Sequence, residues 1–178
     1  MKLRRCKNCK ERFEPLQPLQ YVCGYKCANE YQKLLKTNKE AKEWRVKKAQ
    51  MKSDLLTHKD YIKMLQVVFN AFIRERDKSL SCISCGTTKN VEYAAGHFYP
   101  TTYQFLRFNE DNVHKQCNKH CNMMLRGNIN EYRPNLEKKI GFERLQWLHH
   151  NRHNRLELSI PELKELIKEY KLKTKNLK

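Results

Sequence analysis

The sequence has few acidic residues, few glycines and prolines, and a small apolar fraction. Its 178 residues include 19 Asp and Glu against 37 Lys and Arg, which gives a formal net charge of +18. This excess favours a polyanion as ligand. Five Gly and five Pro interrupt the chain, so long helices are permitted. Hydrophobic residues make up 39% of the chain, below the ~45–50% usual in globular domains, so a large single core is not expected.

Long apolar runs are also lacking. No run approaches the ~18 residues of a membrane span, and the basic start of the chain lacks the apolar stretch of a signal peptide. We therefore expect a cytoplasmic protein that makes no membrane contact. Disulfides are rare in that reducing compartment, so the eight cysteines indicate metal ligation.

The cysteines form two quartets, each made of two close pairs. The first is Cys6-x2-Cys9 with Cys23-x3-Cys27, and the second is Cys82-x2-Cys85 with Cys117-x3-Cys121. A close pair places two thiolates on one turn, and a second pair completes a tetrahedron around zinc. The spacing predicts two structural zinc ions, which would compensate for the small core. Because His114 and His120 flank Cys117, either could replace a cysteine at the second site, although four thiolates remain the first expectation.

Helical signals dominate the rest of the chain. Helix-forming residues run from Ala28 to about Ser53, and apolar residues at helical spacing predict a helix over 58–76 with Thr57 as its N-cap. Residues 79–108 lack a helical period and predict short strands and loops. A further helix is expected over about 136–149, and a capping box at Ser159 opens the last one.

These signals divide the chain into four segments and predict a mostly helical α+β protein. We expect an N-terminal zinc finger with four cysteine ligands over 1–30, a basic helical segment for dimerisation or DNA binding over 31–78, a core over 79–134 and a basic helical region over 135–178. The core segment has a net charge of only about +2. Basic arms around a nearly neutral, ligand-rich centre are typical of a nucleic-acid enzyme.

Three polar residues are interleaved with the second cysteine quartet. His97 follows Gly96, Asn112 comes fifteen residues later, and Asn122 directly follows Cys121. This order resembles the HNH nuclease motif, whose fold is a ββα hairpin and helix around a divalent metal ion. The resemblance implies that His97 is the general base, that Asn112 holds the hairpin loop, and that Asn122 ligates a catalytic Mg²⁺ or Mn²⁺.

Independent chemistry agrees with these assignments. Phosphodiester hydrolysis needs a base that is neutral near pH 7 and a cation that neutralises developing charge. The family places a metal-ligating Asp or His before the base, where this chain has Gly96. His114 is our preferred replacement, since strand alternation from Asn112 would keep it on the same face. Other candidates are Asp111, Asn128 and Glu131.

A closer resemblance covers nearly the whole chain. The segments 95–97, 106–117, 121–122 and 127–133, together with the N-terminal quartet and the basic C-terminal helix, look like the phage NinG (Rap) recombination family. The resemblance implies a structure-specific, phage-encoded endonuclease that acts in the bacterial cytoplasm and cuts Holliday junctions and D-loops. It also implies a homodimer, because a four-way junction needs two symmetric cuts, and possible contacts with other recombination proteins.

Basic side chains near these motifs are candidates for phosphate contacts. Arg is suited to bidentate phosphate binding, and the family match favours Arg133 as a site residue. The remaining candidates for DNA binding are Lys2, Arg4, Arg5 and Arg126. Any of these arginines and lysines could instead lie on a solvated surface.

Two functions therefore compete at this stage. One is a metal-dependent endonuclease for branched DNA. The other is a zinc-stabilised, non-catalytic protein that binds branched DNA and in which His97 is structural. The missing side chain at Gly96 keeps the second alternative open.

Overall fold

The computed structural model describes residues 3–178, so the predicted DNA contact Lys2 lies outside the described residues. The chain divides into two compact units, residues 1–56 and 57–178. This division differs from the four expected segments, because the first long helix crosses the boundary at residue 30 and the second helix belongs to the second unit. Within the described residues, none of the helices combines the length and the apolar character that a membrane span requires.

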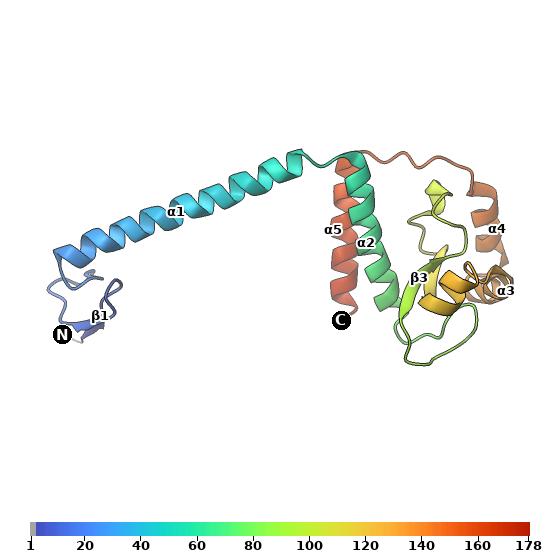
Figure 1. Cartoon of the computed structure of the whole chain (residues 1–178), viewed down its shortest axis with the longest axis horizontal. Helices are drawn as coiled ribbons and strands as arrows, with labels where there is room; N and C mark the ends of the chain where they lie inside the picture. The colour runs from blue at the N-terminus through green and yellow to red at the C-terminus, as the bar shows by residue number, and fades with distance from the viewer. Residues whose placement is uncertain (1–2) are drawn as a thin grey trace. The chain divides into compact units, whose positions relative to one another are not determined.

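The first unit is a short β-hairpin followed by one long helix. Strands β1 (Arg4–Arg5) and β2 (Arg12–Phe13) pair antiparallel, and α1 covers Tyr25–Asp54 (Figure 1). None of the residues of α1 is buried. Helix α1 therefore owes its stability within this unit to helix-forming residues rather than to packing.

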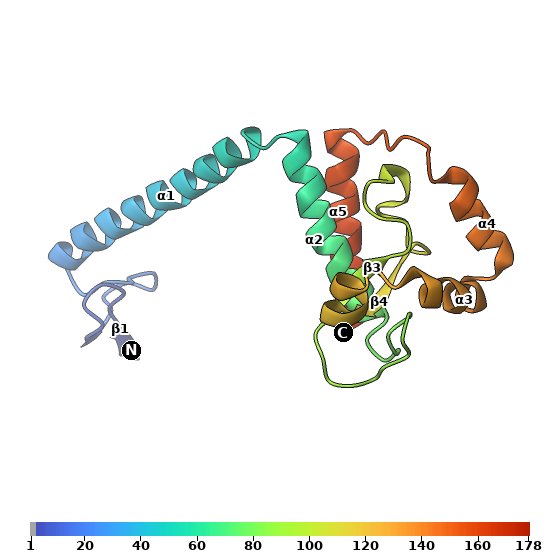
Figure 2. The same cartoon turned by 45° about the vertical axis from the view of Figure 1, so that its right-hand side comes forward.

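The second unit is built on a pair of helices that lie side by side in both views (Figures 1 and 2). They are α2 (His58–Arg76) and α5 (Ile160–Asn176), and each begins with a capping box, at Thr57 and Ser159 respectively. The bounds of α2 and both caps confirm the sequence prediction, and α5 extends to Asn176 through the basic tail. The apolar face of α2 packs on α5, where Phe69 and Phe72 have ring centroids 5.0 and 5.2 Å from that of Tyr170.

A β-hairpin lies beside α2. Strands β3 (Tyr93–His97) and β4 (Val113–Cys117) are antiparallel, with Gly96 opposite His114 and His97 opposite Val113. The loop between them contains a short 3-10 helix, η1 (Gln104–Leu106), and β4 continues directly into a π-helical turn, η2 (Asn118–Met124).

Two more helices cover the other side of the hairpin. The helix expected over 136–149 is in fact two, α3 (Ile129–Ile140) and α4 (Phe142–Asn151), separated by Gly141 at φ +85°. A positive φ is strained for residues other than glycine and ends the helix there. A second apolar cluster joins these helices to the hairpin loop; its buried members are Phe98, Leu106, Tyr132, Leu136, Leu145 and Leu148. The fold is thus mostly helical α+β with two small cores, as the composition predicted.

Candidate functional site

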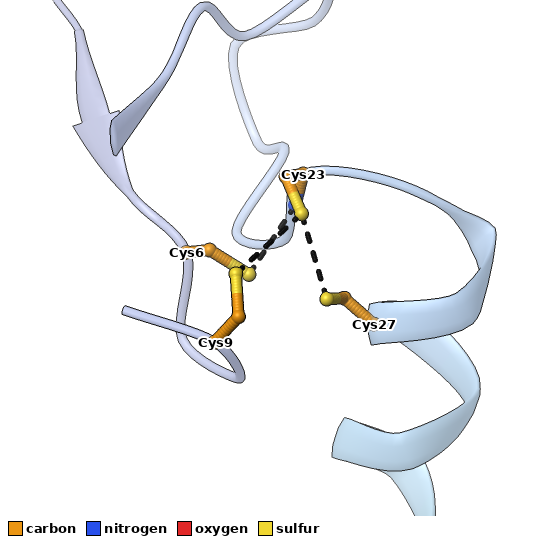
Figure 3. Close-up of side chains that lie close together, drawn as sticks. All are labelled: Cys6, Cys9, Cys23 and Cys27. Carbon is orange, nitrogen blue, oxygen red and sulfur yellow. Dashed lines mark hydrogen bonds between the residues drawn. The ribbon is translucent and has the colours of Figure 1, made fainter. Parts of the chain in front are cut away.

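The first cysteine quartet gathers four sulfur atoms between the β1–β2 hairpin and the start of α1 (Figure 3). The four Sγ atoms lie within 4.8 Å of one another, and Cys23 Sγ is 3.7 Å from Cys9 Sγ and 3.5 Å from Cys27 Sγ. Burial of the Cys6 thiol opposes ionisation, but backbone N–H groups, chiefly that of Cys23, outweigh it and lower its pKa to about 6. Hydrogen bonding with Cys27 and Cys9 raises the pKa of Cys23 to about 12. Four thiols at these distances need a cation before all can ionise.

The second quartet has the same construction inside the second unit. Cys82 and Cys85 lie on a turn, Cys117 ends β4 and Cys121 lies in η2, and their sulfur atoms are again within 4.8 Å of one another. Both turns close with the same backbone hydrogen bond, because Lys10 N–H donates to Cys6 O at 3.0 Å and Gly86 N–H donates to Cys82 O at 2.9 Å. The two quartets are consistent with two structural zinc ions, and each supplies its four ligands without a histidine.

Asn112 is fully buried at the end of the hairpin loop. Its Oδ1 accepts the N–H of Tyr99 at 2.7 Å, and its Nδ2 donates to the carbonyl oxygens of Tyr99 at 2.9 Å and of Leu106 at 3.0 Å. These three bonds join the strand end that carries His97 to the far side of the loop. Asn112 therefore fixes the backbone on which His97 stands.

His97 is half-buried at the end of β3. Its Nε2 lies 3.0 Å from the carbonyl oxygen of Arg107. Because a carbonyl can only accept, Nε2 must carry the ring proton, and the neutral ring keeps its lone pair on Nδ1. Burial lowers the pKa of His97 and outweighs the hydrogen bond to the Arg107 carbonyl, so the neutral form dominates at pH 7. A neutral imidazole with a fixed tautomer is the form that accepts a proton.

His114 lies on a different face of the hairpin from His97, although it is opposite Gly96. Side chains alternate along a strand, and the register puts His114 opposite Gly96, so His114 points to the hairpin face that His97 does not occupy. His114 is 2% exposed and both ring nitrogens are engaged. Nε2 donates to Asp111 O at 3.1 Å, while Nδ1 is 2.9 Å from both Arg76 Nη2 and Lys139 Nζ. No ring nitrogen of His114 is left for a metal ion in this arrangement.

His114 is engaged by a buried ionic cluster around Asp77, which had no signal in the sequence. Asp77 is 2% exposed, and its carboxylate lies 2.9 Å from Arg76 and 3.3 Å from Lys139. Burial opposes the charge of Asp77, but contacts with His114 and Arg76 and attraction to Lys139 outweigh it and hold its pKa far below the usual range. Asp77 Oδ2 also accepts the backbone N–H of Lys115 at 3.1 Å, so the cluster fastens α2 to β4.

The structure explains why residue 96 is glycine. A Cβ on Gly96 would lie 2.3 Å from Gln116 Oε1 and 2.8 Å from Gln116 Cβ. The Gln116 side chain is fully buried, and its Nε2 donates at 2.6 Å to both Ser84 Oγ and Gly127 O. The space that a metal-ligating side chain at residue 96 would occupy is therefore filled by Gln116.

The remaining predicted site residues are distributed over the unit. Asn122 lies on η2, where its Nδ2 donates to Asn118 Oδ1 at 3.3 Å. Burial raises the pKa of Tyr99 and lowers that of His149, and the charge of Arg133 on α3 opposes the first shift and adds to the second. Arg126 is exposed at φ +48°.

Arg4 and Arg5 are exposed on β1 in the other unit. Of the alternative metal ligands, Asp111 is paired with Arg144 and Asn128 Nδ2 donates to Cys121 Sγ at 3.7 Å. The contact most relevant to His97, the carbonyl of Arg107, had no sequence signal, because any residue can supply a carbonyl.

Comparison with known proteins gives a consistent result across the whole chain. The family described as Bacteriophage Lambda NinG protein matches residues 1–178. The curated protein named Protein ninG of Escherichia phage lambda is 38% identical over 192 residues, which cover 98% of this chain and 93% of the relative. Protein ninG of Salmonella phage P22 is 35% identical over 192 residues, covering 98% and 94% respectively. No solved structure matches the chain.

Proposed function

The chain belongs to the NinG family of lambda-like phages, and from this premise we propose that it is a divalent-metal-dependent endonuclease that hydrolyses phosphodiesters in branched DNA. The substrates we propose are Holliday junctions and D-loops formed during phage recombination. The assignment of the hairpin and η2 as an HNH-like core is part of this proposal.

The observation that carries the proposal is the setting of His97. Its half-buried imidazole lies at the end of a strand, and Nε2 donates a hydrogen bond to Arg107 O at 3.0 Å. Burial lowers the pKa of His97. In the proposed reaction, Nδ1 takes a proton from the attacking water. Asn112 keeps the loop that presents the Arg107 carbonyl in place, because it binds the backbone on both sides of that loop. Asn112 is therefore a positioning residue.

A catalytic metal ion would neutralise charge that develops on the phosphate. Asn122 suits it, since the hydrogen bond to Asn118 uses the amide nitrogen and leaves the harder carbonyl oxygen for a cation. Mg²⁺ keeps several waters and accepts few protein ligands. We therefore propose that Asn122 would hold Mg²⁺ or Mn²⁺ through its carbonyl oxygen, whereas His114 does not contribute in this arrangement.

Charge supports a nucleic-acid substrate. The chain has a net charge of +18, so binding to phosphates should depend strongly on salt. Arg133, which is exposed on α3, is our proposed phosphate contact from that helix. We also propose a homodimer, because a four-way junction requires a cut on two strands; light scattering of the protein alone and with a junction tests this.

The deciding experiment uses a labelled four-way DNA junction with Mg²⁺ or Mn²⁺. We compare wild type with His97→Ala and with His120→Ala, which removes an exposed histidine on η2 as a matched control. Loss of a general base typically costs 10²–10⁴-fold in rate, so His97→Ala should cut at least about a hundredfold more slowly while binding the junction as tightly as wild type. Equal cutting by His97→Ala and wild type would refute the role of His97.

One observation favours a second candidate, a non-catalytic protein that holds branched DNA. The position before His97 is filled by Gln116 and both nitrogens of His114 are engaged, so the family's metal-ligating side chain has no replacement there. This alternative predicts tight junction binding without cleavage by wild type in either metal. The junction experiment therefore separates the two functions.

A further inference from the structure

Two hollows lie on either side of η1 in the second unit and share one lining residue, Gln104. Their volumes are about 400 Å³ and about 390 Å³. Pockets for small ligands start at roughly 300 Å³, so each hollow has room for a small ring system and its substituents. Because Gln104 borders both, the two hollows adjoin at this residue, and we call the pair the track.

The lining of the track is basic. Lys59, Lys63 and Arg107 line the first hollow, and Arg152 and Arg155 line the second. None of the residues that line either hollow, all within the described range 57–178, is acidic. Five permanent cations without a carboxylate among them suit a chain of phosphates.

The second hollow also offers aromatic rings. The rings of Tyr103 and His153 both border it, with centroids 5.4 Å apart, and the ring of Tyr99 lies 5.5 Å from that of Tyr103. His153 is exposed and Tyr103 half-buried. Bases that are not paired stack on such rings regardless of sequence, and duplex bases cannot reach them.

The first hollow is joined to His97 through a single residue. The carbonyl oxygen of Arg107 accepts a hydrogen bond from His97 Nε2. The guanidinium of Arg107 lines the hollow and donates a hydrogen bond to Gln66 Oε1 at 2.6 Å. Both ends of Arg107 are thereby fixed.

We propose that the two hollows bind an unpaired stretch of one DNA strand. A base stacks on the exposed ring of His153, which Tyr103 supports edge to face, and the adjoining phosphates contact Lys59, Lys63 and Arg107 in the first hollow. The proposal rests on the proposed nuclease function, and it adds that the protein selects branches that expose unpaired nucleotides next to the cut.

The stacking half of the proposal is tested with the zinc-loaded full chain without added Mg²⁺. Fluorescence anisotropy measures binding of a labelled single-stranded oligonucleotide and of a duplex of the same length. The double variant Tyr103→Leu with His153→Ala should bind the single strand at least about fivefold more weakly, which is the lower limit for loss of one base–aromatic stack. Its duplex affinity should change less than about twofold. Single-strand affinity within about twofold of wild type, or an equal loss for both DNAs, would overturn the proposal.

The phosphate half is tested by the dependence of binding on salt. Single-strand binding loses about 0.7 in the slope of log K against log salt for each phosphate contact removed. Lys59→Gln with Lys63→Gln should therefore reduce the slope by about 1.4. The control pair Lys171→Gln with Lys175→Gln removes the same charge from exposed positions on α5 and should leave the slope unchanged. An equal reduction by both pairs contradicts a defined track.

Two further measurements separate this proposal from the nuclease proposal. Zinc content and thermal unfolding of each variant show whether it is folded as wild type is. Junction cleavage is followed on the same samples. Single-strand binding that depends on Tyr103 and His153, in a protein that does not cut, refutes the nuclease alone, whereas His97-dependent cutting with unchanged single-strand binding by the variants refutes the track alone.

Discussion

Adding one methyl group at Gly96 should destabilise the second unit strongly. The new Cβ of Gly96→Ala would lie 2.3 Å from Gln116 Oε1, 2.8 Å from Gln116 Cβ and 2.9 Å from Gln116 Cδ. The Oε1 atom can move when the side chain rotates, but Cβ is attached to the backbone of the neighbouring strand and cannot. Overpacking typically lowers the free energy of unfolding by 1–3 kcal/mol. Because the contact with Cβ cannot relax, we expect a loss of about 3 kcal/mol for Gly96→Ala.

A double variant identifies the cause of the loss. Gln116→Ala alone removes two buried hydrogen bonds and leaves a small cavity, which costs about 3 kcal/mol. Combined with Gly96→Ala, it relieves the contacts with Oε1 and Cδ and leaves only that with Cβ. The double variant should therefore be about 1–2 kcal/mol more stable than the sum of the single losses predicts.

The assay is urea unfolding of the zinc-loaded protein. The chain has two tryptophans, and Trp44 lies on the exposed helix α1. In a Trp44→Phe background, fluorescence of Trp147 reports on the second unit by itself. A Gly96→Ala variant within about 0.5 kcal/mol of the background protein, or losses that simply add, would refute the assignment of Gln116 as the group that excludes a side chain at residue 96. The same reasoning predicts that Gly96→Asp destabilises the protein instead of restoring a metal ligand.

Three further predictions follow from the site and its supports. Because burial lowers the pKa of His97, cleavage should stay constant from pH 8 down to below about 6.5 and fall only when the ring protonates; a kcat/KM profile that falls already above pH 7 contradicts this assignment. The pKa of Asp77 in the folded protein lies far below its unfolded value of about 3.9, so the charge of Asp77 stabilises the fold above that pH, and this stabilisation is lost as the pH falls. Asp77→Asn should therefore cost about 3 kcal/mol in urea unfolding at pH 7 and weaken the loss of stability at acid pH. An unchanged dependence of stability on acid pH contradicts the cluster. Elemental analysis should find two zinc ions per chain, and Cys121→Ser should reduce this to one and unfold the second unit, whereas retention of two would refute the ligand set.

The two quartets show what spacing alone can predict. Close pairs of cysteines have few uses in a reducing compartment, and the turn that joins them needs only local backbone geometry. The starts of α2 and α5 at the caps Thr57 and Ser159 were predictable for the same reason, because a capping box depends on two side chains only three residues apart.

Predictions failed where the outcome depended on contacts between distant segments. The face on which His114 lies is set by the register of β4 against β3, and its partners Arg76 and Lys139 come from two different helices. Gly141 separates α3 from α4 through a backbone angle that the surrounding apolar pattern does not reveal.

The sequence by itself therefore determined the charge, the two sulfur clusters, the helical class and the family, since these depend on composition, short spacing and similarity along the chain. Only the tertiary structure decided what surrounds each polar group. It placed Gln116 over Gly96, engaged both nitrogens of His114, and fixed the tautomer of His97 through a backbone carbonyl. The physical reason is that residues far apart in the chain bury each candidate site residue and supply its hydrogen-bond partners. Burial and hydrogen bonds together set the pKa of the side chain and decide which of its atoms remain available to a ligand.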